Sequence, residues 1–174
     1  MWVFGYGSLL WNPGFEVHHE MRATLHGFGR SFCMRSIHHR GTETDPGLVL
    51  ALDAVAGTVC EGVALRVVPG QEAATLAYLR ERELVSSAYV EHLLPITLED
   101  GTVQDALAYV IDPDHVQYCA ALPLEEQAQI IARAHGGRGP NAEYLMNTAD
   151  HLAELGVHDA DLQWLAVRVR SLCA

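Results

Sequence analysis

The chain has 174 residues, of which 49% are hydrophobic and 19% are charged. This hydrophobic content is sufficient for a sizeable core and is higher than that of disordered chains. Its 11 positive charges oppose 22 negative ones, giving a formal net charge of −11, and every positive residue is arginine. The lack of lysine excludes pyridoxal-phosphate enzymes, Schiff-base aldolases, Walker A proteins and serine hydrolases with a lysine base. The acidic balance argues against non-specific nucleic-acid binding.

The first two-thirds of the chain favour strands, because apolar and β-branched runs alternate there with turn residues. Asp100-Gly101 separates two of these runs and is a strong hairpin signal. Strands are expected over residues 3–6, 23–25, 32–37, 49–52, 61–68, 90–98 and 103–111.

Helices are expected mainly in the last third. Pro69 and the acidic first turn after it predict one earlier helix that continues to about Leu84. Helices are then expected from Pro123 to Gly136, over 141–155 and over 159–172. No repeat or linker interrupts the chain, so the pattern predicts a single α+β domain over residues 1–174.

The sequence also indicates a compartment. No basic segment precedes the first apolar strand, and no apolar run approaches the ~20 residues of a membrane span. The four cysteines are scattered without a Cys-x-x-Cys pair, so buried free thiols are expected rather than a disulfide framework or a zinc knuckle. We therefore expect a cytoplasmic protein with no membrane contact.

The segment Val3-Phe4-Gly5-Tyr6-Gly7-Ser8-Leu9 is the first candidate site, a strand that ends in a turn of small residues. Glycine permits positive φ angles and a close approach of a ligand to the backbone. Consecutive N–H groups in such a turn can bind an anion such as a carboxylate. An ordinary tight turn is the alternative. A dinucleotide fingerprint is excluded, because a third glycine and a following helix are missing.

The end of the first helix is the second candidate site. Glu81 and Glu83 are two residues apart, so one can face solvent while the other faces a cleft. A carboxylate in an apolar cleft is a useful base near neutral pH. A solvated helix end is the alternative, and spacing alone does not single out Glu83.

Ten histidines invite a metal hypothesis, but their spacing does not support it. Adjacent histidines, as in His38-His39, point to opposite faces of a strand, and no His-Glu-x-x-His motif is present. The glycine-rich stretch 135–141 is expected to join two helices, with Asn141 near an N-cap. Ser8 lacks the Gly-x-Ser-x-Gly surroundings of a nucleophile. We therefore expect no metal and no serine nucleophile.

Taken together, these segments resemble the ChaC-like γ-glutamylcyclotransferases, which act on glutathione. The resemblance keeps the family order and spans nearly the whole chain. In one stretch, Leu84–Ala88, it departs from the glycine pair found in some members, and a less flexible loop there could alter substrate preference. The matching segments are 3–13, Arg35, 40–42, 46–47, 62–66, Arg82-Glu83, Tyr89 and 139–145.

The resemblance implies that glutathione is cyclised to 5-oxoproline and cysteinylglycine. The α-amine of the substrate attacks its own γ-carbonyl, Glu83 serves as the base, and the segment from Val3 to Leu9 holds the α-carboxylate. No lysine, serine or cysteine nucleophile is needed. The possible auxiliary residues, for a carboxylate or for the oxyanion, are Arg35, Arg40, Tyr89 and Tyr144.

The resemblance also implies a small mixed β-barrel flanked by helices, with a helical C-terminal third. No cofactor, metal, nucleic acid, membrane or obligate protein partner is expected. Three alternatives remain: a cyclotransferase for other γ-glutamyl amines or amino acids, a non-catalytic module that binds a γ-glutamyl or other carboxylate ligand, and a metal hydrolase that uses histidines.

Overall fold

The computed structural model describes all 174 residues. They form two compact units, the first made of Met1–Arg30 and Leu52–His115 and the second of Ser31–Ala51 and Val116–Ala174. Two long strands, β2 and β3, each begin in one unit and end in the other.

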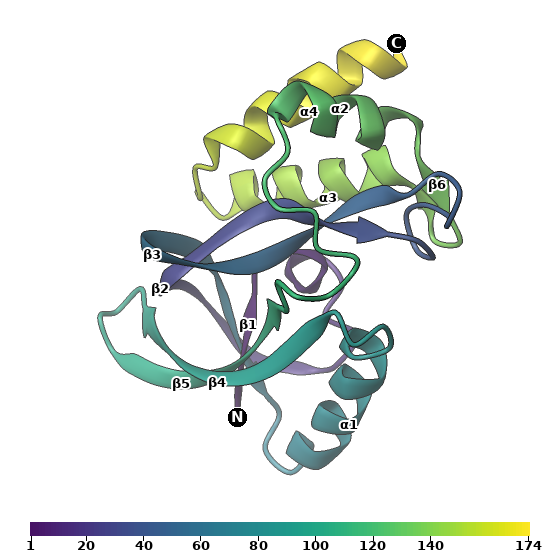
Figure 1. Ribbon diagram of the computed structural model, residues 1–174. Helices are drawn as coiled ribbons and strands as arrows, with labels where there is room; N and C mark the ends of the chain where they lie inside the picture. Colours follow the sequence, from purple (N-terminus) through teal and green to yellow (C-terminus); the bar gives the residue numbers. More distant parts are fainter. The chain divides into compact units, whose positions relative to one another are not determined.

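Five strands close into a mixed β-barrel in the order β1-β3-β2-β4-β5 (Figure 1). Strand β5 completes the closure by pairing in parallel with both β1 and β3, whereas the β1–β3, β2–β4 and β4–β5 pairs are antiparallel. This arrangement confirms the expected barrel. The elements are β1 (Trp2–Gly5), the 3₁₀ turn η1 (Ser8–Leu10), β2 (Val17–Ser36), β3 (Gly47–Val67), α1 (Glu72–Glu83), β4 (Tyr89–Leu98) and β5 (Val103–Ile111).

The predicted hairpin between β4 and β5 is confirmed. Thr97 lies opposite Val103 in the antiparallel register, and Gly101 takes the positive φ of 85° that the turn requires. The Asp100 carboxylate accepts hydrogen bonds from the backbone N–H and the hydroxyl of Thr102, at 2.9 and 2.7 Å. Local turn chemistry therefore fixes this register.

Strands β2 and β3 are each continuous where the sequence predicted two shorter strands. Gly27 and Gly57 lie inside them with φ of 84° and 82°. Positive φ inside a strand is typical of a bulge, which bends the strand without ending it. In sequence, the glycines at these bends resemble the glycines of turns, which explains the wrong division.

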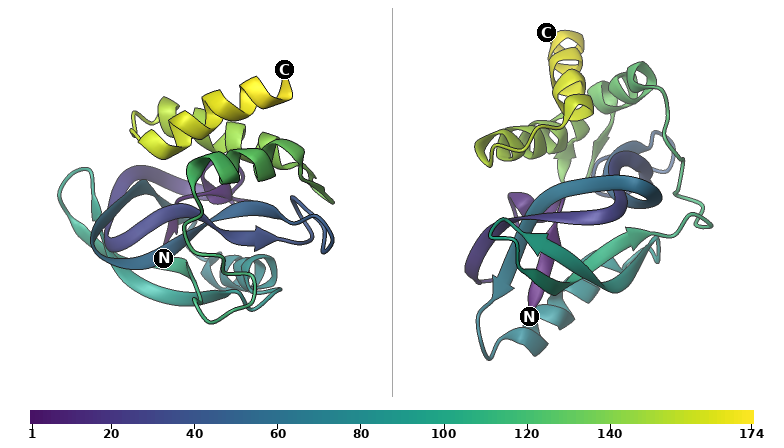
Figure 2. Two further views of the ribbon diagram at one scale, coloured as in Figure 1. Left: turned by 45° about the horizontal axis from the view of Figure 1, so that its top comes forward. Right: turned by 90° about the vertical axis from the view of Figure 1, so that its left-hand side faces the viewer.

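Three helices fill the second unit: α2 (Leu124–Arg133), α3 (Asn141–Glu154) and α4 (Ala160–Cys173). Helix α4 contacts both α2 and α3 (Figure 2). The predicted helices are confirmed to within a few residues, and Asp159 caps α4 by accepting the Leu162 N–H at 3.0 Å. The loop expected after α2 contains a short hairpin, β6 (His135–Gly136) with β7 (Gly139–Pro140).

Asn141 lies next to the N-cap of α3, Pro140, as expected, but its side chain does not cap the helix. It is the first residue of α3 and is fully buried. Its side-chain amide accepts a hydrogen bond from the Leu48 N–H at 2.7 Å and donates one to the Leu48 carbonyl at 2.8 Å. The amide group thus takes the place of a neighbouring strand beside β3, because it carries the same donor and acceptor as a peptide.

Each unit has its own apolar core. The largest buried side chains of the first unit are Phe4, Leu25, Leu52, Leu65, Leu79, Ile96 and Tyr109, and those of the second are Phe32, Leu48, Leu50, Ile131 and Leu145.

None of the helices is long and apolar enough to cross a membrane.

Candidate active site

The turn after β1 is tightly packed. Val3 and Phe4 are fully buried, and a side chain on Gly5 would meet the Val63 Cγ2 atom at 3.0 Å. Gly7 follows with φ of −137°, and neither glycine adopts a positive φ. At Gly5, the lack of a side chain therefore permits close packing, and neither glycine uses the left-handed conformation that glycine permits.

A single 3₁₀ turn follows, where the sequence indicated no helix. Its first internal hydrogen bond runs from the Leu10 N–H to the Gly7 carbonyl at 2.9 Å, and no side chain caps its start. The N–H groups of Ser8 and Leu9 precede that bond, and such groups need another acceptor. These donors are compatible with the predicted carboxylate-binding turn, which stays a prediction.

Tyr6 ties the turn to the barrel. Its hydroxyl donates a hydrogen bond to the Tyr109 carbonyl at 2.9 Å. Its own carbonyl accepts one from Arg30 at 3.2 Å, and the same Arg30 nitrogen donates to the Glu61 carbonyl at 2.8 Å. The turn is therefore anchored to three strands, which gives it a fixed shape.

Glu83 and Glu81 have different surroundings, as their spacing allows. Glu81 is exposed, whereas the side chain of Glu83, the last residue of α1, is only 16% exposed. The Glu83 Oε1 atom lies 3.1 Å from Nε of Arg82 in an ion pair. A solvated helix end thus describes Glu81 and does not describe Glu83.

Arg82 connects the end of α1 to the segment after the turn, a role that its sequence pattern did not indicate. Its Nη2 donates to the Ser8 hydroxyl at 3.0 Å. Its Nη1 donates to the carbonyls of Asn12 and Pro13, at 2.6 and 3.1 Å, and to the Tyr78 hydroxyl at 3.2 Å. The two predicted sites, the turn and Glu83, are therefore joined through one guanidinium group.

Tyr109 is a second residue that the sequence pattern did not single out. Burial, mainly, raises the pKa of its phenol, and the nearby charges of Glu91 and Glu83 raise it further. The phenol donates a hydrogen bond to Glu91 at 3.2 Å. In turn, hydrogen bonds from Arg80, at 2.8 and 3.0 Å, hold the pKa of Glu91 below its ordinary value. In sequence, Tyr109 resembles any aromatic residue of a buried strand.

The loop before β4 contains the departure from the family pattern. Ser87 takes a φ of 58°, a left-handed conformation that costs a residue with a side chain about 1–3 kcal/mol. Tyr89 follows as the first residue of β4, opposite Ile111. The segment is therefore constrained where glycine would be free, and its effect on substrate preference stays a prediction.

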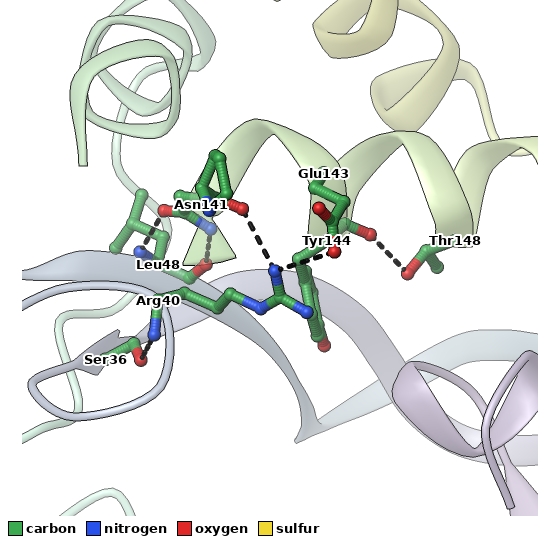
Figure 3. A network of polar contacts seen from close by, with 8 residues as sticks. Ser36, Arg40, Leu48, Asn141, Glu143, Tyr144 and Thr148 are labelled. Carbon is green, nitrogen blue, oxygen red and sulfur yellow. Dashed lines mark hydrogen bonds and ion pairs between the residues drawn. The ribbon is translucent and has the colours of Figure 1, made fainter. Parts of the chain in front are cut away.

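Arg40 and Tyr144, two of the four auxiliary candidates, lie together in the second unit (Figure 3). The Arg40 side chain is 7% exposed and its Nη1 lies 3.3 Å from Glu143. The same nitrogen donates to the Pro140 carbonyl at 3.1 Å, and the guanidinium lies 5.9 Å from the centre of the Tyr144 ring. These contacts hold the start of α3 in place.

Tyr144 and Arg35 make further hydrogen bonds in the second unit, and each of these bonds involves a main-chain group. The Tyr144 hydroxyl accepts a hydrogen bond from the Leu50 N–H at 3.2 Å. Arg35 donates its N–H to the Gln117 carbonyl at 2.8 Å and accepts a hydrogen bond from the Gln117 side chain at 2.9 Å. Glu83, the turn and Tyr89 belong to the first unit, whereas Arg35, Arg40 and Tyr144 belong to the second.

The histidines and cysteines give no further site. His38 and His39 are exposed, and no cluster of three or more histidine, cysteine or acidic side chains has the arrangement of a metal site. All four cysteines are free thiols, two of them buried as expected. That expectation is wrong for the other two, since Cys119 is half-buried and Cys173, at the end of α4, is exposed.

Two solved structures have a fold similar to that of this chain. A glutathione-specific γ-glutamyl cyclotransferase from yeast superimposes with a TM-score of 0.88 at 26% identity, covering 99% of this chain and 96% of that one. A protein described as a γ-glutamyl cyclotransferase, at 17% identity and a TM-score of 0.59, shares the fold. The five-strand mixed barrel with C-terminal helices is therefore a known architecture.

The sequence comparisons agree. The chain is 37% identical over 174 residues to the glutathione-specific γ-glutamylcyclotransferase of Escherichia coli (strain K12), covering 100% of this chain and 74% of that protein. It is 34% identical over 178 residues to γ-glutamylcyclotransferase 2-3 of Arabidopsis thaliana, covering 99% and 89%. The family model of the ChaC-like proteins matches residues 1–172. The chain therefore belongs to the ChaC-like protein family.

Proposed function

We propose that this chain is a γ-glutamylcyclotransferase that converts glutathione to 5-oxoproline and cysteinylglycine. The observation that carries the proposal is the mostly buried Glu83, linked through Arg82 to the turn after β1, in a member of the ChaC-like family. Two relatives that match nearly the whole chain are named as γ-glutamylcyclotransferases, one of them as glutathione-specific, and they support the proposal.

The reaction is an intramolecular acyl transfer. The α-amine of the γ-glutamyl group attacks the γ-carbonyl carbon, a ring C–N bond forms, and the C–N bond to the cysteine nitrogen breaks. The attacking nitrogen loses two protons as it changes from an ammonium to the ring amide, and the leaving nitrogen gains two as it becomes an ammonium, so no water, oxidant or other reactant is consumed. Holding the two reacting ends together can supply about 7–11 kcal/mol of the barrier.

Glu83 is the proposed base. At neutral pH the attacking amine is an ammonium, which cannot attack until it loses a proton. A carboxylate beside it can take that proton and return it to the departing nitrogen, a contribution of typically ~100- to 10,000-fold. Because the substrate supplies the nucleophile, Ser8 is free to serve as an acceptor for Arg82.

The segment from Val3 to Leu9 is the proposed site of the substrate α-carboxylate. The uncapped N–H groups of Ser8 and Leu9 support this assignment. Tyr89 and Tyr144 remain candidate donors to the oxyanion, and Arg35 and Arg40 candidate partners of a carboxylate. The Glu143 carboxylate already neutralises part of the Arg40 charge.

We also propose that the two units work as one domain, which a family match through residues 1–172 supports. Four free thiols are compatible with the reducing cytoplasm as its compartment. Glutathione is the proposed partner of this protein, and the proposal includes no cofactor, nucleic acid or obligate protein partner.

The replacement Glu83→Gln tests the base. The amide keeps the size of the side chain but cannot take a proton, so turnover of glutathione to 5-oxoproline should fall by about 100- to 10,000-fold. Glu81→Gln is the matched control, since Glu81 is exposed on the same helix. Near wild-type turnover by folded Glu83→Gln protein would remove Glu83 from this role.

A further inference from the structure

We infer that Arg82 is a positioning residue, which fixes the orientation of the Glu83 carboxylate relative to the turn after β1. The inference rests on the proposed function, because the position of Glu83 matters only if Glu83 moves a proton. It concerns a residue that makes no proton transfer of its own.

The burial and contacts of Arg82 are unusual for a helix-end arginine. Its side chain is 7% exposed. Its guanidinium donates four hydrogen bonds, to Ser8, Asn12, Pro13 and Tyr78, and also pairs with Glu83. A planar fork of donors can satisfy several acceptors at once, whereas a lysine ammonium on a flexible stem cannot reproduce that geometry.

The segment that accepts these bonds is itself held close to α1. Gly14 has a φ of 75°, and a side chain there would overlap the Tyr78 hydroxyl. Tyr78 lies one turn before Arg82 on the helix and accepts one of its hydrogen bonds at 3.2 Å. Arg82 thus lies between the helix and the segment of residues 8–14. Its hydrogen bonds to both sides hold the guanidinium in one position.

The ion pair between Arg82 and Glu83 joins two consecutive residues at the end of α1. Consecutive helical residues point about 100° apart, so they do not normally face each other. Here Glu83 nevertheless reaches back until its Oε1 lies 3.1 Å from the Arg82 Nε atom. This contact holds one oxygen of the Glu83 carboxylate beside the Arg82 guanidinium. The adjacent cation also favours the ionised carboxylate that a base requires.

The test compares Arg82→Gln and Arg82→Lys with the wild type in glutathione turnover over a range of pH. For Arg82→Gln we expect kcat to fall about 10- to 100-fold, as for a misplaced catalytic group. The acid limb of its kcat/KM profile should move to higher pH, because the cation beside the Glu83 carboxylate is gone. Arg82→Lys should restore the acid limb but not kcat, since it keeps the charge and loses the fork.

Arg168→Gln is the matched control. Arg168 also forms an ion pair with a glutamate, Glu125, at 2.7 Å, but in the second unit. It should leave the pH profile unchanged. If folded Arg82→Gln protein keeps the wild-type kcat and pH profile, or loses only thermal stability, Arg82 is merely structural and the inference is wrong.

A measurement on the wild-type chain covers the case in which the variants do not fold. The NMR signal of the Arg82 Nε–H should shift as Glu83 titrates, and the shift should be absent in Glu83→Gln. An Nε–H signal that does not respond to this titration would overturn the inference. Failure of the proposed function looks different, because the wild-type chain would then release no 5-oxoproline from glutathione.

Discussion

At the scale of single residues, the proposed chemistry requires very few functional groups. An intramolecular acyl transfer needs one base, donors for a carboxylate and a means to hold both in place. The groups proposed for these roles are Glu83, the backbone of Ser8 and Leu9, and Arg82, and none of them is a lysine. The absence of lysine, which excludes several other mechanisms, is therefore no obstacle to this one.

Gly7→Val tests the turn at this scale. Gly7 is buried at the start of the 3₁₀ turn, and a branched side chain there should keep a substrate carboxylate away from the neighbouring N–H groups. We expect the KM for glutathione to rise at least about 10-fold, or activity to be lost, as a steric block on a binding contact implies. Unchanged steady-state kinetics of the folded variant would remove the turn from the substrate site.

At the scale of elements, side chains complete hydrogen bonds that the strands and helices cannot make alone. Asn141 on α3 supplies both partners of the Leu48 backbone on β3. Arg80 on α1 pairs with Glu91 on β4, and Glu91 accepts a hydrogen bond from Tyr109 on β5. Each contact joins two different elements and so fixes their packing.

Asn141→Ala should destabilise the protein strongly. Asn141 is fully buried, so its removal leaves the Leu48 N–H and carbonyl without partners. Two unsatisfied buried groups cost about 2–4 kcal/mol, which urea unfolding would measure. Asn147→Ala, on the same helix but half-buried, is the control and should change stability little. Equal stabilities of the two variants would contradict this account of Asn141.

The Arg80–Glu91 pair predicts a pH-dependent stability. Hydrogen bonds from Arg80 lower the folded pKa of Glu91 below its ordinary value of 4.5. The pair therefore stabilises the fold above that value, and the stabilisation is lost as pH falls through the lowered pKa. Glu91→Gln should lower the free energy of unfolding near neutral pH, and its difference from wild type should shrink in acid. A difference that does not depend on pH, measured by urea unfolding, would contradict this.

Sequence signals predicted well those elements that depend on residues close together in the chain. The Asp100-Gly101 turn and the helix after Pro123 are present as predicted, because turn and capping preferences act within a few residues. The continuity of β2 and β3 was missed, because it depends on pairing between strands. The contacts of Arg82 join residues about 70 positions apart, so periodicity could not indicate them. Glu83 came from the family resemblance, because spacing treats it like Glu81.

At the scale of the whole molecule, the charge sets a condition on the active site. A net charge of −11 weakly repels an anionic substrate such as glutathione from the protein as a whole. Because salt screens exposed charges over about 8–10 Å, capture must depend on donors within that distance of the substrate. The turn after β1 is the proposed source of these donors, and both units lie within the ChaC-like family match.

The most direct test of the central claim is to incubate the purified chain with glutathione and quantify the products. We expect 5-oxoproline and cysteinylglycine to appear in equal amounts, with no added metal or cofactor, and at a much lower rate with Glu83→Gln. Parallel incubation with γ-glutamyl-alanine shows whether other γ-glutamyl compounds are preferred. Glutathione that is bound but recovered intact would contradict the account and would identify a binding module in place of an enzyme.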